Sequence, residues 1–117
     1  MNDYEKEIEK TLRQLGANGS YIGFGYMIYG ICETIENPEL IIYICKGLYT
    51  EIATHYHVTI GNVERNIRTV INNIWEYGDR DLLNQIFGRE LNAKPRNNIF
   101  IDVLSHYITN FCLVNQE

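Results

Sequence analysis

The sequence is poor in the residues that mark unusual classes of protein. Its 117 residues include only two prolines and nine glycines, which argues against a low-complexity or fibrous chain. The three cysteines, Cys32, Cys45 and Cys112, are odd in number and widely spaced. Such cysteines are more typical of buried thiols in a reducing compartment than of a disulfide framework. The most apolar stretch, residues 21–32, is too short to span a bilayer and is expected to form a buried helix.

Positive charge is also scarce. Ten Lys and Arg residues face 15 Asp and Glu residues, so the net charge is −5. This excludes a generally basic protein that coats nucleic acid or an anionic membrane, but it leaves room for a local basic patch. The N-terminus, MNDYEKEIEK, is not a signal peptide, so we expect a cytoplasmic protein. With 45% hydrophobic and 21% charged residues, the chain is expected to form a single globular domain over 1–117.

Hydrophobic spacing predicts an all-α fold of six or seven short helices. In the N-terminal half, a first helix is expected to end at Gly16. Ser20 is a candidate N-cap for a second helix, whose three glycines indicate a closely packed neighbour. Asn37, followed by Pro38, predicts the start of a short helix that ends near Gly47 and turns Cys45 to its apolar side.

The clearest predicted helix follows a cap at Thr59 and ends at Gly78. Its apolar stripe consists of Ile60, Val63, Ile67, Val70, Ile71 and Ile74. Asp79 is expected to cap a helix over 79–87, and a polar loop over 89–96 leads to a last helix that opens at Asn97 or Asn98. We find no repeat, no linker and no convincing strand, so a compact six- to seven-helix domain is expected.

Residues 49–78 have the pattern of a helix-turn-helix. A short helix with Ile52 and Ala53 precedes a tight turn at 57–59, and the helix after Thr59 carries polar groups on its outer face. Arginine suits guanine, asparagine suits adenine, and glutamate can accept a hydrogen bond from cytosine. Thr59 and the first amides of the second helix suit phosphate. The alternative is an ordinary helical hairpin with a solvated polar face.

The same region resembles the C-terminal DNA-binding domain of the sporulation initiation response regulator. The resemblance is carried by the motifs LYTEIA, VERNIR, WEYG, IFG and AKP, which lie between residues 48 and 95 in the family's order and spacing. It covers about residues 10–110 and implies a six-helix transcriptional effector domain that reads DNA through the helix over about 60–77. It also implies that the helix over 79–87 contacts the sigma factor of RNA polymerase and that copies pair on DNA.

The expected DNA contacts combine the outer-face residues with the positions that match the family motifs. Contacts at bases or the nearby backbone are expected from Asn62, Glu64, Arg65, Asn66, Arg68 and Thr69, and contacts at phosphates from Thr59, Lys94 and Arg96. Asn62 departs from the family pattern, which has a basic residue just before V-E-R. A loss of one arginine–guanine contact would change the DNA sequence that is read. The family's phosphorylated receiver domain is also not expected within 117 residues.

Other chemistries lack support in the sequence. His55 and His57 with Cys45 have no second ligand pair, so we expect no metal site and no cofactor. No phosphate-binding loop and no catalytic constellation is present, so an enzyme is not expected. The second hypothesis is an interaction module that keeps the fold, has weak or no specific DNA binding and uses its acidic surface for a protein partner.

Overall fold

The structure is a computed structural model that describes residues 3–115. It contains six α-helices, and none of the described residues forms a strand, so the all-α prediction is confirmed. The helices are α1 (Asp3–Gln14), α2 (Ile22–Glu36), α3 (Thr50–Tyr56), α4 (Ile60–Tyr77), α5 (Arg80–Phe87) and α6 (Asn97–Asn115). A 3₁₀ turn, η1 (Pro38–Ile41), and a π-helical turn, η2 (Cys45–Tyr49), connect α2 to α3.

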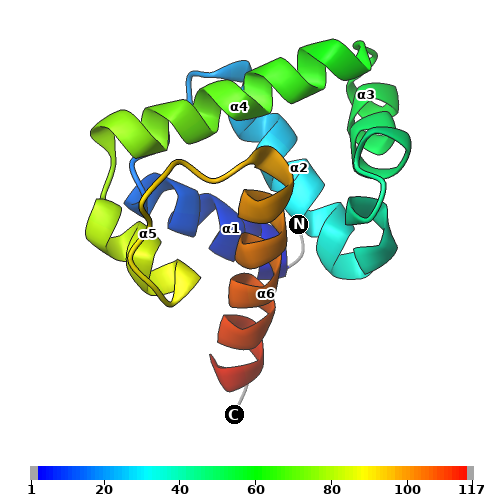
Figure 1. The fold of residues 1–117 in the computed structure, drawn as a ribbon. Coiled ribbons are helices and arrows are strands. Elements are labelled where there is room, and N and C mark those ends of the chain that lie inside the picture. Colours follow the sequence, from blue (N-terminus) through cyan, green and yellow to red (C-terminus); the bar gives the residue numbers. More distant parts are fainter. Residues whose placement is uncertain (1–2, 116–117) are drawn as a thin grey trace.

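The long helix α4 lies across one side of the molecule, with α1 and α2 beneath it (Figure 1). Helix α2 is the centre of the fold, since it packs most extensively against α4 and α6. Helix α6 starts near α4 and runs away from it, so that its C-terminal half extends beyond the rest of the body (Figure 1). This arrangement leaves one face of α4 uncovered. None of the described helices is long and apolar enough to span a bilayer.

Two glycines of α2 allow the close packing that the sequence predicts. A Cβ atom on Gly23 would lie 2.1 Å from the backbone oxygen of Asn66, so the backbones of α2 and α4 meet directly there. A Cβ atom on Gly30 would lie 2.9 Å from the side chain of Ile52 in α3. The loss of helix propensity at these glycines, about 1 kcal/mol each, is therefore offset by packing that no larger residue permits.

The ends of α1 and α4 meet at a second close contact. Gly16 has a φ of 99°, a left-handed conformation that glycine adopts readily, and it ends the first helix as predicted. A Cβ atom on Gly16 would lie 2.7 Å from the Cα of Gly78, and the Asp79 amide donates a hydrogen bond of 3.0 Å to the Leu15 carbonyl. This contact fixes the point where α4 ends and α5 begins.

Most predicted helix boundaries are confirmed. The Thr59 hydroxyl accepts a hydrogen bond of 3.0 Å from the Asn62 amide, and the Asp79 carboxylate accepts one of 3.0 Å from the Leu82 amide. The five residues Val63, Ile67, Val70, Ile71 and Ile74 form the buried stripe of α4. Ile60, which the spacing also assigned to that stripe, is 40% exposed because it lies at the helix end beyond the contact with α2.

The prediction that Ser20 caps α2 is wrong. Tyr21 occupies the N-cap position and makes no capping hydrogen bond with its side chain. The Ser20 hydroxyl donates instead to the side-chain oxygen of Asn18, at 2.8 Å, and the Ser20 amide donates to the same oxygen at 2.9 Å. Asn18 thus forms a local turn that engages the Ser20 hydroxyl, the group that a capping serine would direct to the helix amides.

The segment over 37–49 also differs from the prediction. Asn37 makes no capping hydrogen bond with its side chain, and a 3₁₀ turn followed by a π turn replaces the expected regular helix. A Cβ atom on Gly47 would lie 2.4 Å from the Leu40 carbonyl oxygen, so the loop folds tightly on itself. Because regular helical spacing is lost here, Cys45 is exposed rather than turned to the apolar side.

Candidate nucleic-acid interface

The candidate interface is built on α3 and α4, which are joined by a short turn. His57 ends α3 in the left-handed conformation, with a φ of 59°. The Val58 amide donates a hydrogen bond of 3.0 Å to the Ala53 carbonyl, and Thr59 then caps α4. The two helices therefore turn sharply against each other with their backbone groups largely satisfied. Thr59 is exposed at the start of α4, beside amides that have no partner inside the helix.

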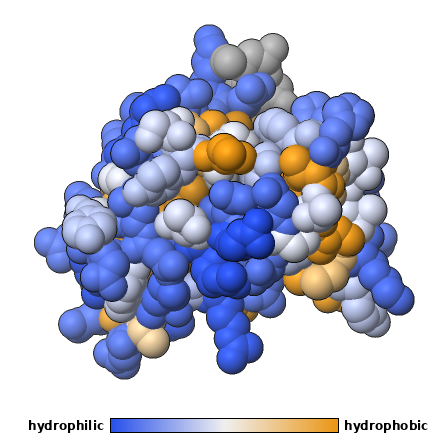
Figure 2. All heavy atoms as spheres, turned by 90° about the horizontal axis from the view of Figure 1, so that it is seen from above, coloured by the Kyte–Doolittle hydropathy of each residue, from blue (hydrophilic) through white to orange (hydrophobic). Residues whose placement is uncertain are grey.

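The uncovered face of α4 is mainly hydrophilic. Seen from the side of α4, the molecule shows a strongly hydrophilic group near its centre and smaller hydrophobic patches around it (Figure 2). The exposed polar side chains in the first half of the helix are Arg65, Arg68 and Thr69. Helix α4 thus presents two arginines to solvent on a domain whose net charge is −5.

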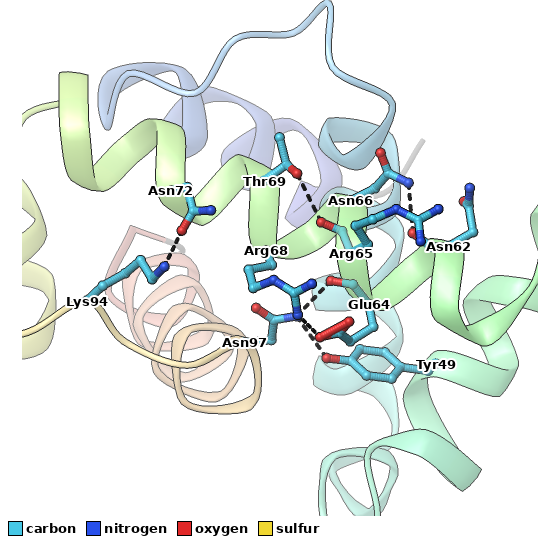
Figure 3. A network of polar contacts seen from close by, with 10 residues as sticks. All are labelled: Tyr49, Asn62, Glu64, Arg65, Asn66, Arg68, Thr69, Asn72, Lys94 and Asn97. Atoms are coloured by element: carbon cyan, nitrogen blue, oxygen red, sulfur yellow. Dashed lines mark hydrogen bonds and ion pairs between the residues drawn. The ribbon is translucent and has the colours of Figure 1, made fainter.

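Two of the predicted base-reading residues are engaged within the protein. The side-chain oxygen of Asn62 accepts a hydrogen bond of 2.8 Å from the Tyr26 hydroxyl on α2. The side-chain amide of Asn66 donates to the Asn62 carbonyl oxygen at 2.8 Å (Figure 3). Both side chains are half-buried. The Asn62 bond joins α4 to α2, whereas the Asn66 bond lies within α4, so both side chains are engaged inside the protein.

The other predicted residues of α4 differ in how far their side chains are engaged within the protein. The Thr69 hydroxyl donates to the backbone oxygen of Arg65 at 3.0 Å, which leaves its lone pairs accessible. Arg68 forms an ion pair with Glu64 one turn earlier. Within residues 3–115, Arg65 makes no ion pair. Arg65 is therefore the cation on this face that is least committed to the protein itself.

The loop before α6 approaches the same face. The Lys94 ammonium donates a hydrogen bond to the side chain of Asn72, which lies on α4 (Figure 3). The exposed Arg96 lies at the start of α6, where its carbonyl accepts a hydrogen bond of 2.9 Å from the Phe100 amide. The fold thus brings Lys94 and Arg96 beside Arg68 of α4, although more than 25 residues of sequence separate them.

A shallow cavity of about 300 Å³ marks the junction between this loop and α4. Arg68, Lys94 and Arg96 line it together with Glu64, so cations predominate at its wall. The side-chain amide of Asn97 donates to the Tyr49 hydroxyl and to the Glu64 carbonyl, both at 3.0 Å (Figure 3). These bonds fix the start of α6 against α4. Burial raises the pKa of Tyr49, and the hydrogen bond from Asn97 partly offsets that rise.

Sequence reasoning did not find the roles of Asn72 and Asn97. Asn72 is not among the predicted contacts, and the sequence indicates Asn97 only as a helix start. Both connect segments that are far apart in sequence, and a single sequence carries no local signal for such a contact.

As for metal binding, the described residues include no group of three or more His, Cys, Asp or Glu residues placed to hold an ion.

The fold and this surface define a small all-α domain with a cationic helix face of the kind that nucleic-acid-binding domains present. The family described as "Sporulation initiation factor Spo0A C terminal" matches residues 8–108, most of the chain. The chain therefore belongs to this family, which consists of DNA-binding regulatory domains of transcription in sporulation and is not a family of enzymes.

Proposed function

We propose that this domain is a sequence-specific transcriptional regulator whose helix α4 enters the major groove of DNA as the second helix of a helix-turn-helix. The exposed Arg65 on α4, which makes no ion pair among the described residues, is the observation that best supports the proposal. Arg68, Lys94 and Arg96 add to it, since they line one cavity beside the same helix. An arginine side chain with free donors can make a bidentate contact to guanine. Lys94 and Arg96 would then lie beside the phosphate backbone.

The remaining predicted residues would contribute to DNA binding in different ways. Thr59 and the first amides of α4 would meet a phosphate, because a helix N-terminus carries partial positive charge. Arg68 would act together with Glu64, since the two are already paired, and Thr69 would contact the edge of the groove. Asn62 would contribute mainly by fixing the helix on α2, and Asn66 is engaged in a bond within α4.

Selection from random duplex DNA, followed by salt titration of the winner against scrambled DNA, tests the proposal. We expect an enriched motif and a specificity ratio of about a thousandfold or more. Few cations lie on this face, so the affinity of one copy is expected to fall only gently with added salt. No enrichment, with weak binding to any DNA, would instead favour an interaction module that keeps the fold and binds a protein partner.

Matched substitutions connect the binding to this surface. Arg65→Ala and Arg68→Ala are each expected to weaken binding to the selected sequence about tenfold or more, with a smaller effect on scrambled DNA. Lys94→Ala is expected to weaken binding to both DNAs and to reduce the salt dependence. Arg89→Ala is the control, because Arg89 is exposed but does not line the cavity beside α4. An equal loss in the control would refute the assignment.

Pairing of copies belongs to the same proposal. The C-terminal part of α6 carries an apolar groove of about 580 Å³ against α5, and Leu113 and Val114 are 58% and 71% exposed near it. A second copy would bury these groups, and linked binding would raise the affinity for paired sites. Val114→Glu is expected to abolish cooperative binding to a two-site DNA while leaving single-site binding unchanged. Retained cooperativity would exclude α6 from the contact.

A contact of α5 with the sigma factor of RNA polymerase is the last part of the proposal. Helix α5 exposes Asp81 and Gln85 to solvent, while Leu83 and Ile86 hold it to the core. We expect Asp81→Lys to leave DNA binding intact and to reduce transcription from a promoter that carries the selected sequence. Unchanged transcription in vitro would remove α5 from this role.

A further inference from the structure

A second cavity, of about 410 Å³, lies between α2 and α3, with the first turns of α1 at its rim. We call it the aromatic cavity. Its lining residues are Glu5, Gly25, Ile28, Tyr29, Cys32, Glu33, His55 and Tyr56. None of them belongs to the proposed DNA interface, and the regulatory function above gives none of them a role.

Three rings form one corner of the aromatic cavity. Tyr29 and His55 are stacked, with ring centroids 4.0 Å apart and planes 16° from parallel. Tyr56 meets Tyr29 and His55 edge-on, at 5.9 Å and 4.8 Å between centroids. The Tyr56 hydroxyl donates a hydrogen bond of 3.2 Å to the Gly25 carbonyl, which ties this ring to α2. The rings are therefore held in place before any ligand arrives.

Apart from His55, the ionisable side chains that line the aromatic cavity are all acids or weakly acidic groups. Glu5 and Glu33 line the aromatic cavity, and none of its described lining residues is a lysine or an arginine. Burial, together with the nearby Glu5, Glu33 and Glu36, raises the pKa of Cys32 to about 11. Burial, Glu33 and Glu51 likewise raise the pKa of Tyr29. The carboxylates therefore act together to make the electrostatic potential in the cavity negative.

Aromatic faces and carboxylates together favour one class of ligand. A cation is attracted by the negative face of an aromatic ring and by nearby carboxylates, whereas an anion is repelled. An alkyl chain attached to the cation would contact Ile28 and the edges of the rings. We propose that the aromatic cavity binds an alkylammonium or guanidinium cation, the chemistry of a lysine or arginine side chain and of a polyamine.

The test is an NMR titration of the folded domain that monitors the amide signals of Gly25, Tyr29 and Cys32. The probes are n-butylammonium, Nα-acetyl-arginine methyl amide and spermidine, with n-butanol and butyrate as neutral and anionic controls. We expect saturable shifts at these amides with cations at millimolar concentration, and none with butanol or butyrate. Equal shifts with butanol, or shifts confined to other amides, would overturn the proposal.

The same titration distinguishes two sources of the cation. Tighter binding of the acetylated arginine amide would indicate a side chain presented by a protein partner, and tighter binding of spermidine would indicate a free polyamine. Either result supports the cation site. Failure of all cations would refute it without affecting the DNA-binding proposal, because the two surfaces share no residue.

Two substitutions assign the binding to the aromatic cavity. Glu33→Gln removes a charge and keeps the shape, and it is expected to weaken cation binding about fivefold. Tyr29→Leu removes a ring and is expected to have a similar effect. Glu39→Gln is the matched control, since Glu39 is an exposed carboxylate outside the cavity. Unchanged affinity in Glu33→Gln would overturn the proposal even if Tyr29→Leu failed to fold.

Discussion

The Tyr26 hydroxyl donates a hydrogen bond of 2.8 Å to the side-chain oxygen of Asn62, which joins the centre of α2 to the first turn of α4. Asn66 lies one turn later, and its backbone oxygen occupies the space that a side chain at position 23 would need. These two contacts place the start of the proposed recognition helix. The side-chain oxygen of Asn62 is thereby engaged inside the protein.

Loss of the Tyr26–Asn62 hydrogen bond is expected to destabilise the domain moderately. Tyr26→Phe should lower the free energy of unfolding by about 1 kcal/mol, the usual net contribution of such a bond. Denaturant titration of Tyr26→Phe, Asn62→Ala and the double variant measures the coupling. The double variant should be less destabilised than the sum of the two single changes. Strict additivity would show that the bond contributes nothing to stability.

Replacement of Gly23 by alanine is expected to be severely destabilising. The added Cβ would lie 2.1 Å from the Asn66 carbonyl oxygen, so α2 and α4 would have to separate. We expect a loss of about 3 kcal/mol or more, measured by thermal unfolding, because the clash is with backbone rather than a flexible side chain.

Gly61→Ala is the matched control for Gly23→Ala. A Cβ atom there would meet nothing within 4 Å, and the residue lies in the first turn of α4. We expect this change to raise stability by up to about 1 kcal/mol through helix propensity. If both alanine variants were equally destabilised, close packing at Gly23 would not be the cause.

The helix caps give a third prediction. Thr59→Ala and Asp79→Ala each remove a side-chain acceptor from a helix N-terminus and should lower the free energy of unfolding by about 1 kcal/mol. Ser20→Ala should change it by less than about 0.5 kcal/mol, because Ser20 is exposed and makes no cap. Chemical denaturation of the three variants checks this order. A large effect at Ser20 alone would contradict it.

The thiols should differ in reactivity. The pKa of Cys32 is raised to about 11, mainly by burial, whereas Cys45 is exposed. At pH 8 we expect iodoacetamide to modify Cys45 well before Cys32, because the thiolate is the reacting form. Mass spectrometry of digested samples over time measures both rates. Equal rates in the folded protein would argue against the burial of Cys32.

The same shift has a consequence for stability at alkaline pH. The folded state keeps the Cys32 thiol protonated up to about pH 11, while the unfolded chain ionises near its ordinary value of 9.0. The stabilising contribution of the neutral thiol is therefore present below pH 9 and is lost as the pH rises toward 11. Cys32→Ala should lose less stability than the unchanged protein between these values. Parallel pH profiles would contradict this.

Local sequence signals predicted much of this protein. The apolar spacing of α4, the caps at Thr59 and Asp79, and the ends at Gly16 and Gly78 are properties of neighbouring residues, and the structure confirms each. The motifs from Leu48 to Pro95 were sufficient to indicate the family. These features depend on interactions within one or two helical turns, so one sequence contains them.

The tertiary structure decided what neighbouring residues could not. Asn62 and Asn66 have the same spacing as outward-facing residues, yet Asn62 bonds to Tyr26 of α2 and Asn66 bonds to the Asn62 carbonyl within α4. The tight loop at Gly47 turned Cys45 to solvent, and Asn18 engaged the amide and hydroxyl of Ser20. The sequence by itself determined which residues are cationic and, outside the segment over 37–49, which segments are helical. Only the packing of distant segments determined which side chains remain exposed, because burial and hydrogen-bond partners depend on contacts between helices.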